Sequence, residues 1–224
     1  RDRGGSLFFT MKHINGQDLR NIILALNDGD ERTTQTFPLS VLIDILIQVC
    51  QTVARAHQRG GIHRDLKPAN ILTGEFGETY VIDWGLAKVW GEPELATFPA
   101  FDYQEDYSLT PVGRRYGTPL YTAPEMMRGD SFVDGRVDVF CLGNVLFEIL
   151  TYQQLLRGET VSQIREALLN QQLPTPCQVA PERDIPTQLE DICCQALQKE
   201  PVDRFDSVRS FLKALLDYRS TRAS

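Results

Sequence analysis

Apolar side chains recur every three or four residues over much of the chain. The clearest case runs from Leu39 to His57, where Gly60 and Gly61 follow as a stop signal. Residues 138–150, 161–169, 187–198 and 207–218 repeat this spacing, which predicts four further helices. Asp18 stands where it would cap a short helix that ends near Leu26.

Strand signals are few and short. Residues 6–11 form an apolar and β-branched run that ends before a turn at Asn15 and Gly16. Residues 71–73 and 79–82 are separated by Gly74 and Gly77, which predicts a hairpin. The stretch 88–124 is rich in Pro, Gly and hydroxyl residues and is expected to be a long loop. The predicted class is α+β, mainly α, with one small hairpin.

Composition and charge narrow the possible partners. The chain has 224 residues, of which 42% are hydrophobic and 24% charged, as in ordinary folded domains. A formal net charge of −7 gives no basic excess for nucleic acid or an anionic membrane. The longest apolar stretches are interrupted by Asp44 and Asp138 and are shorter than the roughly 20 residues of a spanning helix. We expect no membrane span in this segment.

The cysteines form an odd set without C-x-x-C spacing. Three of the five lie inside apolar stretches, which indicates buried free thiols in a reducing compartment rather than disulfides or a metal site. The five are Cys50, Cys141, Cys177, Cys193 and Cys194.

The strongest chemical signal is an octet between the long helix and the hairpin. It reads His63-Arg64-Asp65-Leu66-Lys67-Pro68-Ala69-Asn70, with Asp83-Trp84-Gly85 and then Ala123-Pro124-Glu125 further on. Asp and Asn beside Gly and Pro are usually turn formers, but a turn does not need the whole octet. Phosphoryl transfer does need these types, because it uses a carboxylate for the attacking hydroxyl and hard oxygens for Mg²⁺.

The three motifs, in this order, resemble those of eukaryotic-type (Hanks-type) serine/threonine protein kinases, which carry H-R-D-x-x-x-x-N, D-F-G and A-P-E. Trp84 stands in place of the Phe. The resemblance implies a large C-terminal lobe over residues 16–219. Residues 1–15 would be the last small-lobe strand and the hinge, and 220–224 a tail.

The resemblance also implies roles for single residues. Asp65 would be the catalytic base, and Lys67 would neutralise charge on the transferred group, as in serine/threonine rather than tyrosine kinases. Asn70 would act in catalysis and, with Asp83, hold Mg²⁺. Thr118 would hydrogen-bond the catalytic Asp and Lys.

The implied cofactors are ATP and Mg²⁺. Met11 would be the gatekeeper beside the adenine, and the backbone of Lys12 and Ile14 would face its edge. Asp18 would lie near the ribose, and Leu72 would form the floor of the pocket.

Further positions match the family's structural skeleton. Glu125 and Arg204 match a buried ion pair, and Asp138 matches an acceptor for the backbone of the catalytic loop. Taken alone, Asp138 would be a favourable charge at a helix N-terminus. Arg64 matches a residue that clamps a phosphate on the activation loop, and Thr110 is the hydroxyl we favour there.

Two features of the family are expected ahead of the hinge: a glycine-rich loop and a strand Lys with its helix Glu. The chain has few residues there, so by itself it is expected to be inactive. A non-catalytic scaffold or docking module is the alternative hypothesis. A small-molecule phosphotransferase is a further hypothesis. Arg64 and Glu125 disfavour it, because enzymes of that class have an H-G-D motif in the catalytic loop and lack the Ala-Pro-Glu segment. The kinase interpretation implies protein substrates with Ser or Thr acceptors and a cytoplasmic domain; the oligomeric state is left open.

Overall fold

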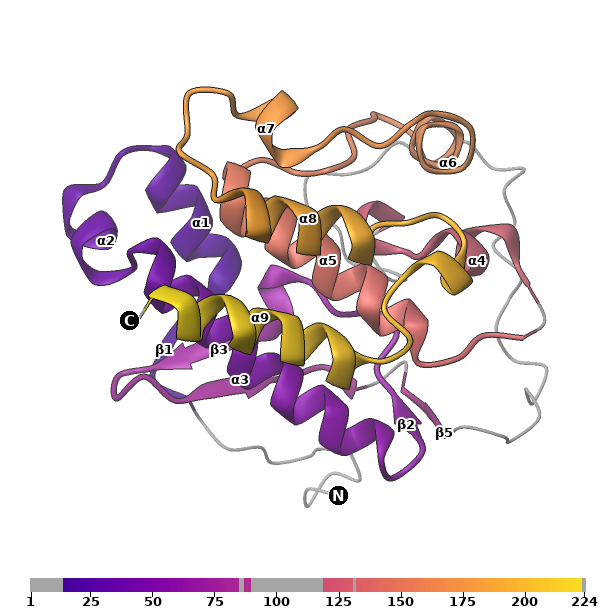
Figure 1. Cartoon of the computed structure of the whole chain (residues 1–224), viewed down its shortest axis with the longest axis horizontal. Helices are drawn as coiled ribbons and strands as arrows, with labels where there is room; N and C mark the ends of the chain where they lie inside the picture. The colour runs from indigo at the N-terminus through magenta and orange to yellow at the C-terminus, as the bar shows by residue number, and fades with distance from the viewer. Residues whose placement is uncertain (1–13, 85–86, 90–118, 131, 223–224) are drawn as a thin grey trace, which may run out of the picture.

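The computed structural model describes residues 14–84, 87–89, 119–130 and 132–222 (Figure 1). Four earlier expectations lie outside these residues: the strand over 6–11, Met11, Lys12 and Thr118. The same holds for most of the predicted loop over 88–124, including Thr110.

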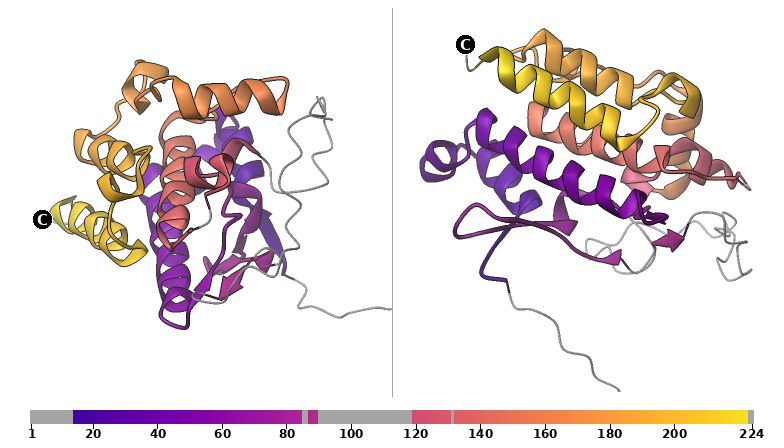
Figure 2. Two further views of the ribbon diagram at one scale, coloured as in Figure 1. Left: turned by 90° about the vertical axis from the view of Figure 1, so that its right-hand side faces the viewer. Right: turned by 60° about the horizontal axis from the view of Figure 1, so that its bottom comes forward.

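Two long helices form the centre of the molecule. Helix α3 (Leu39–His57) has the predicted bounds, and eight of its residues are buried. Helix α5 (Arg136–Thr151) is buried at every position from 137 to 151, because neighbours cover it on all sides. It packs on α3 and on α8 (Thr187–Ala196), while α9 (Val208–Arg222) lies along α3. Figure 2 shows α3 and α5 between the strands and the α8 and α9 layer.

Shorter elements surround this centre. At the N-terminal side, β1 (Gly16–Asp18) leads into α1 (Leu19–Asn27) and α2 (Glu31–Thr36). The remaining helices are α4 (Pro124–Arg128), α6 (Val161–Asn170), α7 (Pro176–Val179) and the 3₁₀ turns η1 (Pro68–Asn70), η3 (Pro119–Tyr121) and η4 (Pro201–Asp203). The predicted helices are confirmed, and the mainly α class with them.

Helix α2 was not predicted, because its six residues are polar and none is buried. It begins instead at a local signal, the Asp30 side chain, which accepts a hydrogen bond from the Thr33 amide. Helix α9 likewise continues to Arg222, beyond the predicted end at Tyr218, through residues without an apolar period. Apolar spacing therefore finds the buried helical turns and misses the solvated ones.

The predicted hairpin is confirmed and gains a third strand. Strands β3 (Ile71–Gly74) and β4 (Thr79–Val81) pair antiparallel, with Ile71 opposite Val81. Strand β1 pairs on the other side of β3 and begins at Gly16, where a turn was expected. A Cβ at Gly16 would lie 1.9 Å from the Thr73 carbonyl oxygen, so the close approach requires glycine.

A second, two-stranded sheet was also not predicted. Its strands β2 (Gly61–Ile62) and β5 (Lys88–Val89) are two residues each, too short for an alternating pattern. They nevertheless fix the segment that leads into the octet around Asp65.

Helix α3 is the only described helix that is long and apolar enough to cross a membrane. Its apolar face is buried against α5 and α9, so packing within the protein already accounts for its hydropathy. The predicted burial of thiols holds for Cys50, Cys141 and Cys193, whereas Cys177 and Cys194 are partly buried.

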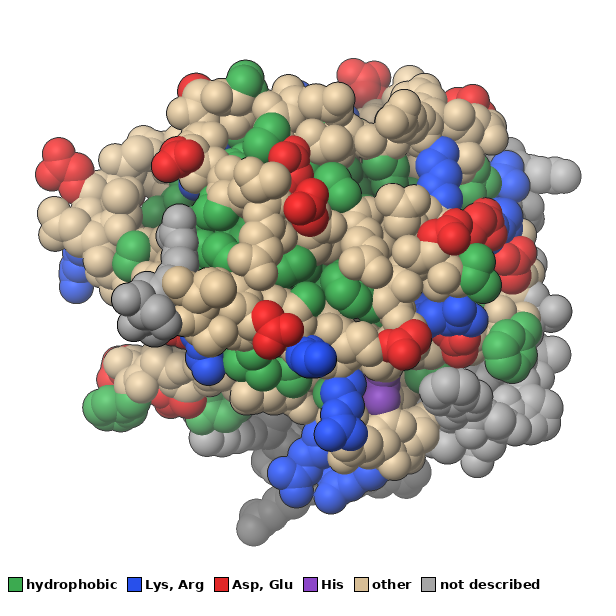
Figure 3. All heavy atoms as spheres, viewed as in Figure 1, with side chains coloured by type: hydrophobic (Ala, Val, Ile, Leu, Met, Phe, Trp, Pro, Cys, Tyr) green, Lys and Arg blue, Asp and Glu red, His purple; other side chains and the backbone are tan. Residues whose placement is uncertain are grey.

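Charged side chains of both signs are interspersed over most of the face in Figure 3. Lys and Arg gather at its lower edge, over the end of α3 and the start of α9, where four exposed cations occur: Arg55, Arg59, Arg209 and Lys213.

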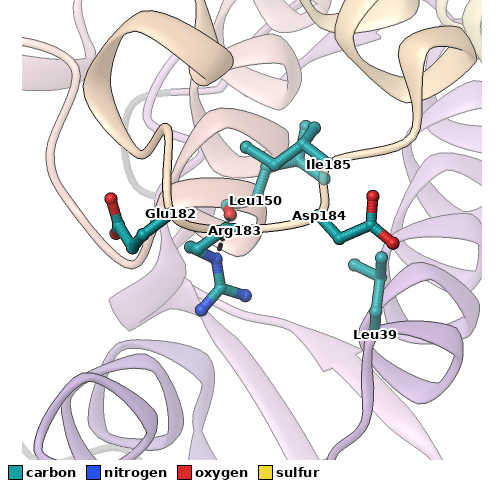
Figure 4. Close-up of a pocket in the computed structure, with 6 residues that line it drawn as sticks. All are labelled: Leu39, Leu150, Glu182, Arg183, Asp184 and Ile185. Atoms are coloured by element: carbon teal, nitrogen blue, oxygen red, sulfur yellow. Dashed lines mark hydrogen bonds between the residues drawn. The ribbon is translucent and has the colours of Figure 1, made fainter.

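A cavity of about 340 Å³ lies between Leu39, the end of α5 and the loop that carries Arg183 (Figure 4). The Arg183 Nε donates to the Leu150 carbonyl, and its guanidinium lies 3.5 Å from the Tyr152 ring centroid. No predicted site residue lines this cavity.

A buried ion pair ties α4 to the segment before α9. Both terminal nitrogens of Arg204 donate to the Glu125 carboxylate at 2.7 Å, and the side chains are 0% and 5% exposed. The remaining Arg204 N–H groups donate to three backbone carbonyls, those of Gln198, Lys199 and Arg136. The predicted pair is confirmed, with every guanidinium N–H group satisfied.

We expect Arg204→Ala to destabilise the protein by about 3 to 5 kcal/mol, because it leaves Glu125 buried without its partner. At about 2 to 4 °C per kcal/mol for a domain of this size, the thermal midpoint should fall by roughly ten degrees. The matched control is Arg219→Ala, which removes an exposed pair with Asp44 whose side chains are 53% and 49% exposed. A midpoint for Arg204→Ala no lower than that of Arg219→Ala would contradict the account.

Candidate active site

The candidate catalytic loop, residues 63–70, is held by one buried carboxylate. Asp138, 0% exposed, accepts from the His63 amide at 2.9 Å, the Arg64 amide at 2.8 Å and His57 Nε2 at 2.7 Å. The predicted contact between Asp138 and the loop backbone is therefore confirmed. It holds Arg64 in a left-handed conformation, φ 67°, which a non-glycine residue rarely adopts without such support.

His63 links this loop to the hairpin. Its Nε2 donates to the Ile82 carbonyl at 3.1 Å, and its Nδ1 accepts from the Asp65 amide at 3.3 Å. The Trp84 ring lies 4.5 Å from the His63 ring, and Trp84 Nε1 donates to the Val81 carbonyl. Trp84 thus packs on the loop that carries Asp65.

Two predicted catalytic side chains, Lys67 and Asn70, converge on one carboxylate oxygen of a third, Asp65. Lys67 Nζ donates to Asp65 Oδ2 at 2.8 Å. Asn70 Nδ2 donates to the same oxygen at 3.2 Å and to the Asp65 carbonyl at 2.8 Å. Asp65 and Asn70 are buried, so their mutual orientation is fixed by the loop and by η1.

Asp83, the fourth of the predicted site residues after Asp65, Lys67 and Asn70, lies at the end of the hairpin. The Ile82 amide donates to the Asn70 carbonyl at 3.0 Å, which brings the two candidate metal ligands to neighbouring backbone positions. Asp83 has a left-handed backbone, φ 61°, and its side chain is exposed. The carboxylate is therefore open to a ligand, whereas Asp65 is enclosed.

The oxygens of Asn70 and Asp83 suit Mg²⁺. Among the described residues no group of three or more His, Cys, Asp or Glu side chains could hold a metal by itself. Mg²⁺ characteristically uses only one or two protein carboxylates and completes its shell with phosphate oxygens and water. The donor set fits an ion that arrives with a nucleotide.

Two of the predicted nucleotide-site residues are brought together. Asp18 is the register partner of Leu72 across β1 and β3. The Asp18 carboxylate also accepts from the amide and the side chain of Asn21, at 2.9 and 2.7 Å, as the cap of α1. Ile14 is half-buried just before β1. Met11, Lys12 and Thr118 lie outside the described residues.

One set of contacts was not predicted. Cys141 Sγ donates to the Tyr121 carbonyl at 3.2 Å, and Asn144 Nδ2 donates to the Leu120 carbonyl at 2.9 Å. One turn further along α5, Glu148 lies near the Tyr121 side chain. Polar residues three and four apart in an otherwise apolar helix were the available signal. They fix η3, which leads directly into Ala123-Pro124-Glu125.

Glu148 has an unusual protonation equilibrium. The side chain is buried, and loss of hydration raises its pKa to about 7, although the Tyr121 hydroxyl and the Arg20 cation act in the opposite direction. Burial, with the Glu148 charge beside it, also raises the pKa of Tyr121. The carboxyl therefore changes charge near neutral pH.

A helical lobe that presents an enclosed carboxylate with a lysine and an amide, beside an exposed second carboxylate, is the architecture of a protein kinase large lobe. The chain belongs to the protein kinase domain family, whose family model matches residues 2–215. It is 31% identical to the serine/threonine-protein kinase PknD of Protochlamydia amoebophila strain UWE25, over 100% of this chain and 23% of the relative.

Two other relatives carry the same name. PknD of Chlamydia pneumoniae is 33% identical over 90% of this chain, and PknD of Chlamydia caviae is 33% identical over 93%. The chain spans 22% of the length of each. It therefore corresponds to less than a quarter of these curated relatives.

The raised pKa of Glu148 predicts a pH-dependent stability. The folded pKa, about 7, lies above the value near 4.5 of an unfolded glutamate, so the folded state binds the extra proton between these values. The contribution of Glu148 to the free energy of unfolding is therefore fully present below about pH 4.5. It is lost as the pH rises through 7, by up to about 3 kcal/mol.

Denaturant unfolding of wild type and Glu148→Gln at several pH values measures this effect. We expect the wild-type free energy of unfolding to fall relative to the variant between about pH 5 and 8. Glu31→Gln, on the exposed side of α2, is the control and should follow wild type. If the free energies of unfolding of wild type and Glu148→Gln changed in parallel with pH, the raised pKa of Glu148 would be contradicted.

Proposed function

We propose that the full-length protein transfers the γ-phosphoryl group of ATP to Ser or Thr hydroxyls of protein substrates. The observation that carries this proposal is the convergence of Lys67 Nζ and Asn70 Nδ2 on Asp65 Oδ2. Membership of the protein kinase family and the names of the relatives support it.

In this proposal Asp65 orients the acceptor hydroxyl and takes its proton as the oxygen attacks. Its contacts leave the carboxylate in one orientation, which is what a base needs if positioning supplies much of the rate. Lys67, bonded to the same oxygen, lies where it balances charge that develops on the phosphoryl group.

Asn70 and Asp83 would hold Mg²⁺, which neutralises the phosphate oxygens when MgATP is bound. The adenosine part would lie along Met11, Lys12 and Ile14, with Asp18 at the ribose and Leu72 beneath the base. The pairing of Asp18 with Leu72 supports a common site for the last two. Thr118 would complete the catalytic set by bonding Asp65 and Lys67.

We further propose a cytoplasmic kinase domain whose protein partners include substrates with Ser or Thr acceptors. The net charge of −7 supports the absence of a nucleic-acid partner. The inactivity of the 224-residue chain by itself stays a prediction.

The test is Asp65→Asn in the full-length protein. We expect phosphorylation of a generic protein substrate with MgATP to be lost, because the amide keeps the size of the side chain and cannot take the proton. Thermal melting should show an intact fold. The control, Asp191→Asn on the exposed side of α8, should retain wild-type turnover.

Two results would contradict the proposal in different ways. Wild-type turnover by folded Asp65→Asn would overturn the role of the base. Absence of turnover in the wild-type protein across a range of Ser and Thr substrates would favour the scaffold hypothesis.

A further inference from the structure

Four exposed cations form a basic patch where the end of α3 meets the start of α9 (Figure 3). Arg209 and Lys213 are four residues apart, so they lie on one side of α9, about 6 Å apart along its axis. Arg55 is in the last turn of α3, and Arg59 follows in the turn that ends the helix. The basic patch therefore has one row of two cations on each helix.

The two rows lie level with each other. Arg219 Nη1 bonds Asp44 Oδ1 at 3.0 Å, so the end of α9 lies beside the start of α3 and the packed helices run antiparallel (Figure 1). Arg55 is eleven residues after Asp44, and Arg209 is ten residues before Arg219. At 1.5 Å per residue both lie about 15 to 17 Å from that ion pair, in the same direction. Like charges are thus gathered across the helix–helix contact.

Nothing in the described part of the chain neutralises these charges. None of the four side chains has an ion-pair or hydrogen-bond partner among the described residues. Other cations of the described chain are mostly bonded to carboxylates or backbone carbonyls: Arg128, Arg136, Arg183, Lys199, Arg204 and Arg219. The basic patch is therefore the place where positive charge is left open to a partner.

The stability of the helices explains only part of the basic patch. Arg55, in the last turn of α3, interacts favourably with the helix dipole. Arg209 lies in the first turn of α9, where the dipole disfavours a cation and no acidic residue is present. Arg209 therefore adds to the positive potential of the patch at a cost to its own helix, which an anionic partner would offset.

Exposed acids limit the extent of the basic patch along α9. Asp206 precedes Arg209 by three residues, and Asp217 follows Lys213 by four. The positive stretch between them is roughly 15 Å long, the reach of about five residues of extended chain. A bilayer or a nucleic-acid duplex is larger and would also face these carboxylates, in a chain whose net charge is −7. A short acidic stretch of protein would contact the cations alone.

We propose that the basic patch is a docking surface for an acidic stretch of a partner protein, about five residues long, with Asp or Glu at alternate positions. Alternate side chains of an extended chain project to the same side about 6 to 7 Å apart, which matches the spacing along each row of cations. The proposal goes beyond the proposed function, because the patch contains no residue assigned to catalysis or nucleotide binding.

The first test is fluorescence anisotropy of a labelled peptide, three Glu residues alternating with Gly, titrated with the full-length protein. We expect binding that weakens about tenfold between about 50 and 300 mM salt, because salt screens exposed charges. The same peptide with Gln in place of Glu should not bind. Failure of the Glu peptide to bind would overturn the proposal, as would binding of phosphatidylserine vesicles or duplex DNA in its place.

Paired substitutions locate the binding. Arg55→Gln with Arg209→Gln should weaken peptide binding about tenfold, because two exposed ion pairs are lost. Arg59→Gln with Lys213→Gln should have a similar effect. The matched control is Arg32→Gln with Arg157→Gln, which removes the same charge from exposed positions elsewhere and should bind as wild type. Equal weakening by the control would show that only net charge matters and would overturn the proposal.

Zero-length cross-linking with a carbodiimide gives a second readout. It joins a peptide carboxylate to a nearby lysine amine, so we expect the cross-link at Lys213. Lys199, whose Nζ already donates to the carbonyls of Leu169 and Gln171, is the internal control. Lys213→Arg should remove the cross-link and keep the affinity.

Neither readout depends on phosphoryl transfer. Asp65→Asn, which lies outside the basic patch, should bind and cross-link the peptide as wild type does, even if the proposed function is wrong. Cross-links that leave out Lys213 in the wild-type protein would overturn the docking surface and leave the proposed function intact.

Discussion

The candidate active site depends on a single buried carboxylate at the start of α5. Asp138 accepts hydrogen bonds from His57, His63 and Arg64, and the last two directly precede Asp65 in the chain. A charge in so dry a place is costly unless it is fully hydrogen-bonded, so these three donors and Asp138 stabilise one another. The strained backbone of Arg64, and with it the direction of Asp65, follows from this arrangement.

Helix α5 also positions the 3₁₀ turn η3, which leads into Ala123-Pro124-Glu125. Asp138, Cys141, Asn144 and Glu148 follow one another at intervals of three or four residues, and their contacts extend from the catalytic loop to η3. Helix α5 can serve as a common rigid support because α3 and α8 bury it from end to end. The loop before Asp65 and the segment from Leu120 to Tyr121, far apart in the sequence, are therefore held in a fixed relative position.

Much of this could be predicted from the sequence, for identifiable reasons. Buried helices can be predicted because apolar residues recur at helical spacing. The octet around Asp65 can be recognised from its residue types. Helix α2 and the last turn of α9 have no apolar face, so the apolar pattern of the sequence does not predict them as helical. The pairing of Asp18 with Leu72 and the contacts of Asn144 and Glu148 arise between distant segments, where local patterns carry no information about register or approach.

Amide hydrogen exchange in Asp138→Asn tests the central role of Asp138 most directly. The His63 and Arg64 amides donate to different oxygens of Asp138, Oδ2 and Oδ1. Asparagine keeps the size of the side chain but has an NH₂ group in place of one of these oxygens, so one of the two amides loses its acceptor. We predict that exchange at one or both of these amides accelerates more than tenfold, equivalent to about 1.4 kcal/mol, relative to the amides of α3 and α8. Unchanged protection at both His63 and Arg64 would contradict the account, since the loop would then be held by something other than α5.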